Sequence, residues 1–234
     1  MSKNARRPED SEMYNDAAIA DSYARSSKEG LVGWEERLFV ERILRRMQGA
    51  GEGLQVLDVG TGPGWIPILL AKARPGWNIT AVDYSEPMLE QARRSATREG
   101  ATIRWLCRPA EDTTLPSNGF DLVLSHYTLH EFSDPGAVLR EMVRVLKPVG
   151  LLLIQDMERP PALLMDLSKL VAQVIYRKDP AMKRQYLASI QATYTAAEIE
   201  QLLPRDLAEF LVSRRFSVTG LLLEITARKS QASE

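Results

Sequence analysis

Hydrophobic and polar positions along the chain follow two different periods. Between residues 35 and 47 the apolar residues recur at helical spacing, with Glu and Arg between them: Val40, Ile43, Leu44 and Met47. This pattern predicts an amphipathic helix. The segment 54–59 is a short apolar run that lies between glycines, which is typical of a buried strand.

The same two patterns alternate through the middle of the chain. Further helices are predicted over 66–73 and 85–98, with Ser85 as N-cap, and from Asp134 onward. Strands are predicted over 77–82, 102–107, 120–125 and 151–154. Strands that alternate with helices indicate a parallel sheet covered by helices on both faces.

Beyond Asp156 the pattern changes. Residues 157–194 predict two helical stretches and no strand, and the first has an apolar stripe: Leu163, Leu167, Leu170 and Val174. We expect the stripe to pack on the sheet edge, and the alternatives are an apolar substrate pocket and a dimer contact. A capping box at Thr195 and Glu198 opens one more helix, and the runs 209–218 and 221–227 predict two late strands.

Composition and charge narrow the class of protein. The 234 residues suit one domain, and the net charge of -1 gives no general attraction to nucleic acid. The single cysteine, Cys107, cannot form an internal disulfide, and no apolar run suits a signal peptide or a membrane span. We expect a cytoplasmic protein with no nucleic-acid partner, and a mobile tail over 1–12.

A glycine-rich turn at residues 60–64 is the strongest chemical signal. Gly60, Gly62 and Gly64 follow the strand 54–59 and precede a helix, so that a ligand can approach the main chain closely. The bland alternative is a flexible strand-to-helix turn. Asp58, two residues earlier, would repel a diphosphate and suit a cationic ligand, and Asp83 at the end of the next strand can accept hydrogen bonds from a ribose.

Four motifs in order carry a family resemblance. They are Asp58–Gly64, Val82–Ser85, Leu122–His130 and Leu146–Ile154. They resemble the motifs of the class I S-adenosylmethionine-dependent methyltransferases, and most closely the ubiquinone/menaquinone-biosynthesis-like small-molecule group. The resemblance covers residues 54–156, the cofactor half of such proteins.

The resemblance implies a Rossmann-like α/β fold. Its seven-stranded, mainly parallel sheet would have helices on both faces, an antiparallel final strand and a helical lid inserted after strand five. The whole chain would be one domain, divided into N-terminal helices (13–50), cofactor-binding core (54–156), lid (157–194) and closing elements (195–234). S-adenosylmethionine would be the cofactor, S-adenosylhomocysteine the product and a small molecule the methyl acceptor.

The resemblance also implies which residues bind the cofactor. They are Asp58, Gly60, Thr61, Gly62, Gly64, Asp83, Tyr84, Ala110, Glu111 and Ser125. The glycines would surround the methionine and ribose part, Asp83 would hold the ribose, and Tyr84 would lie beside the adenine. Pro109 stands where the family often has an acidic residue, so Ala110 and Glu111 become the candidates for the adenine contact.

Candidate catalytic residues follow the fourth predicted strand. His126, His130 and Glu131 could each accept a proton from the methyl acceptor. The alternative for His130 is loop packing, and the histidine pair does not form a convincing metal site. Tyr14, Tyr23 and Tyr127 are candidates for substrate contacts, and packing on the sheet is the alternative for one of the first two.

Two rival functions come from other classes. One is a nicotinamide-dependent oxidoreductase, against which the spacing of the glycines and Asp58 argue. The other is a non-catalytic subunit or sensor that binds the adenosyl ligand, because one fold serves many activities. The sequence leaves open the acceptor and the oligomeric state, a homodimer included.

Overall fold

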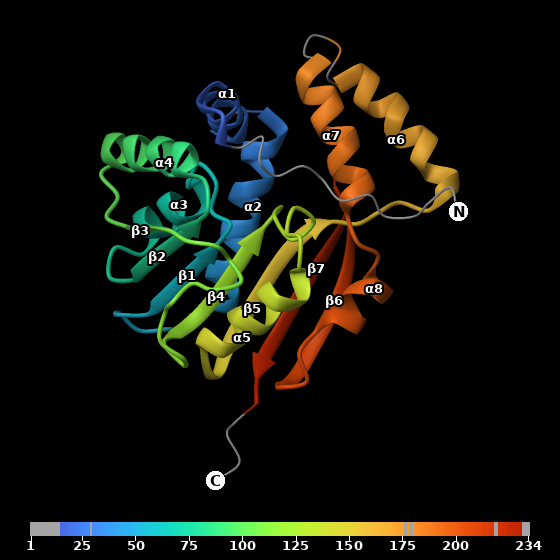
Figure 1. Cartoon of the computed structure of the whole chain (residues 1–234). Coiled ribbons are helices and arrows are strands. Elements are labelled where there is room, and N and C mark those ends of the chain that lie inside the picture. The colour runs from blue at the N-terminus through green and yellow to red at the C-terminus, as the bar shows by residue number, and fades with distance from the viewer. Residues whose placement is uncertain (1–14, 29, 176, 178–179, 218–219, 231–234) are drawn as a thin grey trace.

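A seven-stranded sheet forms the centre of the computed structural model, which describes residues 15–28, 30–175, 177, 180–217 and 220–230 (Figure 1). The strands are β1 (Gln55–Val59), β2 (Asn78–Asp83), β3 (Arg104–Cys107), β4 (Phe120–His126), β5 (Leu146–Met157), β6 (Leu207–Ser217) and β7 (Gly220–Lys229). Their order across the sheet is β3-β2-β1-β4-β5-β7-β6. Neighbours from β3 to β5 are parallel, whereas β7 is antiparallel to β5 and β6. The predicted fold class is confirmed.

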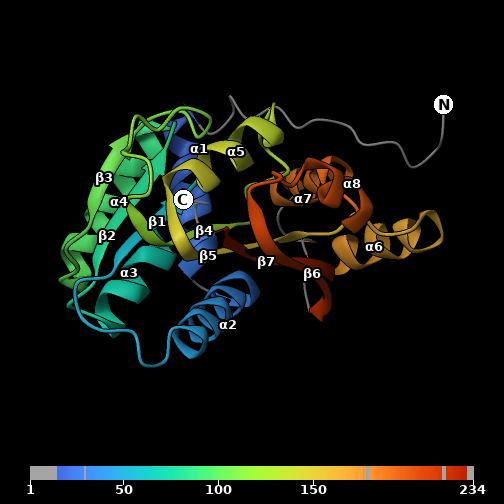
Figure 2. The same ribbon diagram turned by 90° about the horizontal axis from the view of Figure 1, so that it is seen from below.

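Helices cover both faces of the sheet, because successive residues of a strand point to opposite sides. In β1, Val56 belongs to one buried cluster and Leu57 to another. The Val56 cluster includes α2 (Gly30–Arg46) and α3 (Trp65–Ala73), and the Leu57 cluster includes α5 (Pro135–Val145) and α8 (Ala196–Leu202). Figure 2 shows these two groups of helices on opposite sides of the sheet.

Local capping sets where several helices begin and end. The hydroxyl of Ser85 accepts a hydrogen bond from the backbone N–H of Met88 and so begins α4 (Glu86–Glu99), as the sequence predicts. Gly100, with a φ of 67°, ends the same helix. The predicted capping box of Thr195 and Glu198 is present at α8. At the N-terminal side, α1 (Ala17–Lys28) packs against α2 and α4.

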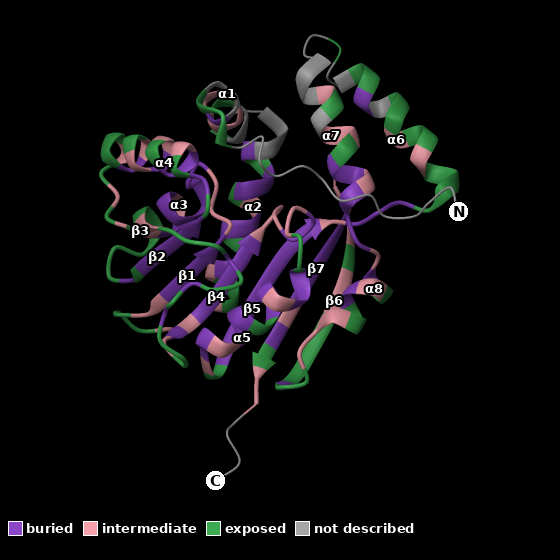
Figure 3. Ribbon diagram, in the orientation of Figure 1, coloured by how far each residue is buried: buried purple, intermediate pink, exposed green. Residues whose placement is uncertain are grey.

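The segment after β5 contains the two predicted helices, α6 (Ala162–Ile175) and α7 (Pro180–Ala192). The apolar stripe of α6, however, faces solvent (Figure 3). The exposed fractions are 88% for Leu163, 55% for Leu167, 57% for Leu170 and 66% for Val174. The prediction that the stripe packs on the sheet edge is therefore wrong, because helical periodicity shows which residues share a face and not what covers it.

No helix in the described ranges is both long enough and apolar enough to cross a membrane.

Candidate functional site

A pocket of about 250 Å³ opens at the carboxyl ends of β1, β2 and β4. Ligands of open α/β sheets bind at this end of the strands. Twelve of the residues that the sequence predicts for the site line it: Asp58, Gly60, Thr61, Gly62, Asp83, Tyr84, Ala110, Glu111, His126, Glu131, Tyr23 and Tyr127. The tertiary structure thus brings together residues from α1, three strands and the loops that follow them.

Glycine is needed at the three positions of the loop for different structural reasons. All of them adopt positive φ angles, 70° at Gly60, 52° at Gly62 and 76° at Gly64. A Cβ at Gly60 would lie 2.4 Å from Thr128, and one at Gly64 would lie 2.5 Å from Trp105. A Cβ at Gly62 would meet nothing within 4 Å. Gly62 therefore leaves open space at the pocket, whereas Gly60 and Gly64 permit close packing within the protein.

Gly64 does not line the pocket. It is the N-cap of α3, which begins at Trp65. Gly64 packs closely against Trp105 and Ala92, and its cofactor contact stays a prediction. Trp65 lines the pocket although only 8% of its surface is exposed.

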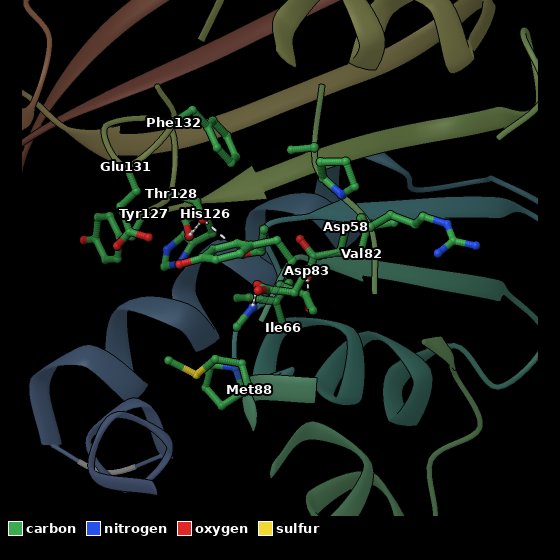
Figure 4. A pocket seen from close by; sticks show the side chains of 18 of the residues that line it. Asp58, Ile66, Val82, Asp83, Met88, His126, Tyr127, Thr128, Glu131 and Phe132 are labelled. Carbon is green, nitrogen blue, oxygen red and sulfur yellow. Dashed lines mark hydrogen bonds between the residues drawn. The ribbon is translucent and has the colours of Figure 1, made fainter. Parts of the chain in front are cut away.

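Two buried aspartates organise the glycine loop. Asp58 accepts a hydrogen bond of 2.6 Å from the hydroxyl of Thr61. Asp83 accepts bonds from the backbone N–H groups of Gly62, at 2.7 Å, and Ser85, at 2.9 Å. Figure 4 shows Asp58 and Asp83 near the centre of the pocket. Asp83 thereby links the end of β2 to the loop that follows β1, which brings two predicted ligand-binding elements into one wall.

Burial makes both aspartates unusually basic. Loss of water raises the pKa of Asp58 to about 7, although its bond from Thr61 acts in the opposite direction. Loss of water also raises the pKa of Asp83 to about 6, against the backbone bonds it accepts. A cation bound between them would favour their ionised forms.

Glu36 is a site residue that the sequence analysis missed. It projects from α2 into the pocket, and its side-chain atom Oε2 is buried without a hydrogen-bond partner in the described part of the chain. Burial, followed by the charge of Asp58, raises the pKa of Glu36 well above its usual value. The signal was present in the sequence, since Glu36 lies four residues before Val40 and seven before Ile43 and so occupies the apolar stripe of its helix.

The charge of the pocket is mostly that of carboxyl groups. They belong to Glu36, Asp58, Asp83, Glu111 and Glu131, whereas Arg108 contributes a guanidinium at the side of Pro109 and Ala110. Such a lining attracts a cationic ligand and repels a diphosphate.

His126 ends β4 and lines the pocket, together with Tyr127 and Thr128 that follow it (Figure 4). Its Nε2 lies 3.0 Å from Nε2 of Gln155, on the neighbouring strand β5. Burial, and to a lesser extent the charge of Arg42, lowers the pKa of His126 to about 3. The prediction that His126 is a general base is therefore not supported, because an imidazole with so low a pKa holds a proton poorly at neutral pH.

His130 does not line the pocket. Its side chain is buried, and its Nδ1 lies 2.7 Å from Oδ1 of Asp156. The alternative interpretation, that His130 packs the loop, fits this placement, and a catalytic role does not. Glu131, the next residue, does line the pocket.

One other predicted residue, Ser125, does not line the pocket. Ser125 is fully buried, its hydroxyl has no hydrogen-bond partner in the described ranges, and it does not line the pocket. Strand alternation explains this placement, because the side chains of Ser125 and His126 point to opposite faces. Tyr14 lies outside the described residues. The described residues contain no group of three His, Cys, Asp or Glu that could hold a metal ion.

The helices α6 and α7 contribute no side chain to this pocket among the residues that line it in the described structure. The prediction of a lid that forms part of the substrate site thus finds no contact here. The walls come from the helices α1, α2, α3 and α4, the carboxyl ends of β1, β2 and β4, the glycine loop and the segments that follow β2, β3 and β4.

Comparison with known proteins agrees with this arrangement. Residues 57–154, which extend from β1 to β5, match the family described as "Methyltransferase domain". This part of the chain is similar to a methyltransferase domain. It contains the glycine loop, Asp83 and His126, the elements on which the resemblance in sequence rests.

Two curated relatives illustrate the similarity in sequence. A demethylmenaquinone methyltransferase of Thermus thermophilus is 34% identical over 107 residues, which cover 46% of this chain and 49% of that protein. A ubiquinone/menaquinone biosynthesis C-methyltransferase of Desulfotalea psychrophila is 34% identical over 145 residues, covering 62% of this chain and 57% of the relative. The chain thus spans about half the length of these relatives.

Solved structures share the fold over a longer range. A SAM-dependent methyltransferase from Aquifex aeolicus has a TM-score of 0.63 at 24% identity, and the match covers 91% of this chain and 97% of that one. A phosphoethanolamine N-methyltransferase of Haemonchus contortus, in a complex with S-adenosylhomocysteine, has a TM-score of 0.70 at 16% identity, with 94% and 58% covered. These likenesses concern the fold alone, which is shared beyond residues 57–154 by the helices and strands on both sides.

Proposed function

We propose that the protein transfers a methyl group from S-adenosylmethionine to a small-molecule acceptor and releases S-adenosylhomocysteine. The methyltransferase domain, the glycine loop and the acidic pocket support this function together. We further propose that the chain acts as one cytoplasmic methyltransferase domain.

The single observation that carries the proposal is the pair of buried carboxyl groups, Glu36 and Asp58, beside an open glycine loop. Neither has a cationic side chain as its partner in the hydrogen bonds of the described chain. A buried carboxyl without a counter-charge is costly unless a ligand supplies one. S-adenosylmethionine carries an ammonium and a sulfonium, whereas a dinucleotide would bring a diphosphate to the same loop.

The pocket residues suggest how the cofactor would be held. Gly62 leaves space at the loop, and we expect the methionine and ribose parts to lie along Gly60 and Gly62. Asp83 has carboxyl lone pairs left for ribose hydroxyls besides the bonds it accepts from the backbone. We expect Tyr84 and Ala110, which line the pocket on the loops after β2 and β3, to meet the adenine.

The main task of the protein in this reaction is to position the two reactants. The sulfonium supplies an activated methyl group when the cofactor is bound, and holding two reactants in line is enough to contribute several orders of magnitude in rate. His126, Tyr127 and Glu131 lie together on one side of the view in Figure 4. We propose that this group, with Tyr23, meets the acceptor.

The relatives suggest the class of acceptor without naming it. One relative is named as a C-methyltransferase of ubiquinone and menaquinone biosynthesis, and another as an O-methyltransferase of ubiquinone biosynthesis. We therefore propose a small organic acceptor whose nucleophile is a carbon, oxygen or nitrogen atom.

Calorimetric titration tests the cofactor assignment directly. We expect the purified protein to bind S-adenosylmethionine and S-adenosylhomocysteine and not to bind NAD. Asp83→Ala should weaken S-adenosylhomocysteine by about 1–3 kcal/mol, the scale of a lost set of polar contacts. Asp121→Ala is the control, because Asp121 pairs with Lys147 away from the pocket.

Transfer of a labelled methyl group to an acceptor panel then tests the reaction. Tight binding of the adenosyl ligands with no transfer to any acceptor would favour the rival binding subunit or sensor. Binding of NAD, or failure to bind either adenosyl ligand, would contradict the proposed function.

A further inference from the structure

A buried series of polar contacts reaches from the far strand β7 to His126 at the pocket. Glu224 of β7 accepts a hydrogen bond of 2.8 Å from Nε of Arg42, which belongs to α2. The Nη2 group of Arg42 donates to Oε1 of Gln155 on β5. Nε2 of Gln155 then lies 3.0 Å from Nε2 of His126. Gln155 has no exposed surface and Glu224 only 2%, so these contacts are shielded from water.

The donors and acceptors of this series can be assigned in only one way. A guanidinium has donors and no acceptor, so the atom of Gln155 that faces Arg42 must be its oxygen. The amide –NH₂ of Gln155 therefore faces His126, and it can only donate. Nε2 of His126 must accept this bond and carries no proton. A neutral imidazole with a bare Nε2 carries its proton on Nδ1.

The surroundings of the ring oppose a second proton. Arg42 lies on the α2 side with Phe39, whose ring centre is 4.7 Å from that of His126. Tyr127 packs on the ring with a centre distance of 4.2 Å. The carboxyl groups that share the pocket are Glu36 from α2, Asp58 from β1 and Glu131 from the loop after β4. None of these three forms a hydrogen bond with His126 among the contacts of the described residues.

We propose that Arg42 and Gln155 hold His126 as the neutral Nδ1–H imidazole, so that it presents a hydrogen-bond donor, and not a base, to the bound methyl acceptor. Nδ1 has no hydrogen-bond partner within the described part of the chain, and its ring lines the pocket. The ligand atom that it serves must bear a lone pair, as the oxygen of a phenolate, enolate or carbonyl does. His126 would orient that atom toward the methyl group. The statement about the acceptor rests on the proposed function, whereas the protonation state of His126 does not.

Arg42 and Gln155 are therefore positioning residues, because they act through His126. Arg46 provides a matched control, since it also donates to Glu224 from α2 and makes no contact with Gln155 among the hydrogen bonds of the described residues. Removal of Arg42 leaves Glu224 with Arg46 and with Arg215, 3.8 Å away, so the carboxylate at the start of the series keeps a counter-charge.

Nitrogen-15 NMR of the imidazoles tests the assignment in the ligand-free protein and with saturating S-adenosylhomocysteine. The chain has two histidines, so the spectrum holds two imidazoles, and His126→Gln identifies one of them. We expect His126 to show a protonated Nδ1 and a bare Nε2, with no titration between about pH 5 and 8. A protonated Nε2, or titration near the ordinary value of about 6.5, would overturn the proposal.

Variants of Arg42, Arg46 and Gln155 test whether the contacts from Arg42 through Gln155 set the protonation state of His126. In Arg42→Met, Gln155 is no longer oriented, so we expect the protonated-Nδ1 signal to be lost in favour of a tautomer mixture, and His126 to titrate at higher pH. Arg42→Lys should restore the wild-type spectrum because it keeps a donor, and Arg46→Met should leave it unchanged. In Gln155→Glu the carboxylate can only accept, so the proton should move to Nε2.

Thermal melting and far-UV circular dichroism confirm that each variant is folded before its spectrum is read. If the folded Arg42→Met and Gln155→Glu proteins both keep the wild-type spectrum, the relay does not position His126 and the proposal fails. Loss of S-adenosylhomocysteine binding in the wild-type protein would instead contradict the proposed function, and the ligand-free spectrum would still decide the state of His126.

Discussion

One carboxylate, that of Asp156, holds both the ring and the backbone of His130. Oδ1 of Asp156 lies 2.7 Å from Nδ1 of the ring, and Oδ2 accepts a bond of 2.9 Å from the backbone N–H of the same residue. Both side chains are buried. This two-point contact connects the loop after β4 to the end of β5, and it assigns His130 to the support of the pocket.

We expect His130→Ala to lower the free energy of unfolding by about 1–3 kcal/mol, because it leaves a buried acceptor of Asp156 without its partner. Chemical denaturation measures this loss. The affinity of the folded variant for S-adenosylhomocysteine should remain within a factor of about two. A large loss of affinity with unchanged stability would show that His130 acts in the pocket after all.

Gly62 and Gly64 should fail in different ways when each is replaced by alanine. At Gly62 the new Cβ enters open space and the φ of 52° costs about 1–2 kcal/mol for an L-residue. We expect a small loss of stability. The affinity for S-adenosylhomocysteine should fall at least about tenfold, because the new Cβ excludes contacts between the ligand and the loop. At Gly64 the Cβ meets Trp105 and Ala92, so the loss of stability should be the larger one. Calorimetry and denaturation of both variants test the difference, and equal behaviour would contradict it.

Glu36→Gln should weaken ligands that carry the ammonium of methionine. A hydrogen bond to a charged group contributes about 1.5–3 kcal/mol. Without the charge of Glu36, S-adenosylhomocysteine should therefore bind at least about tenfold more weakly. Methylthioadenosine lacks the amino-acid part, and its affinity should not change. Glu35→Gln is the matched control, because Glu35 is buried on the same helix but pairs with Ser217. An equal loss for both ligands would place Glu36 away from the ammonium.

The affinity for the cationic cofactor should depend on pH. Burial raises the pKa of Asp58 to about 7 and that of Asp83 to about 6 in the ligand-free protein. A cationic ligand favours the ionised carboxyls, so S-adenosylmethionine affinity should rise as the pH rises through 6 and 7 and then level off. Calorimetry across this range measures the effect, and methylthioadenosine should show a shallower dependence. A flat profile for S-adenosylmethionine would contradict the role of these carboxyls.

The raised pKa of Asp58 also determines how the stability of the ligand-free protein depends on pH. Because the folded pKa of Asp58 lies above the ordinary aspartate value of 3.8, its contribution to stability is fully present below about pH 4 and is lost as the pH rises through about 7. Asp58→Asn should therefore stabilise the ligand-free protein at pH 8 and not at pH 4. This comparison separates the stability of the empty pocket from its affinity for ligand.

Much of the fold could be read from local pattern. The amphipathic stripe of α2, the N-caps Ser85 and Thr195 and the apolar runs of the strands each act over a few residues. The glycine loop is equally local, because positive φ and the absence of a Cβ are properties of single residues. Asp58 and Asp83 were found because carboxyl ends of parallel strands meet at one edge of the sheet.

The exposure of the α6 stripe and the role of Glu36 could not be predicted from local sequence pattern. Helical spacing groups Leu163 with Leu167, but only the tertiary structure shows that both are exposed. Glu36 shares a helix face with Val40, but only the position of α2 over the end of β1 turns that face into a pocket wall. Burial depends on neighbours that are distant in the sequence, and no window of residues contains them.

The two histidines show the same division most clearly. By itself the sequence determined that His126 and His130 follow one strand, four residues apart, at the ligand-binding edge of an α/β sheet. The tertiary structure decided their roles through two successive residues of β5, since Gln155 meets His126 and Asp156 meets His130. The orientation of Gln155 depends in turn on Arg42, 113 positions away, and Arg42 is held by Glu224, 182 positions away. Adjacent strand residues point to opposite faces. Gln155 therefore meets the ring of His126 at the pocket, whereas Asp156 meets the ring of His130, which supports the pocket.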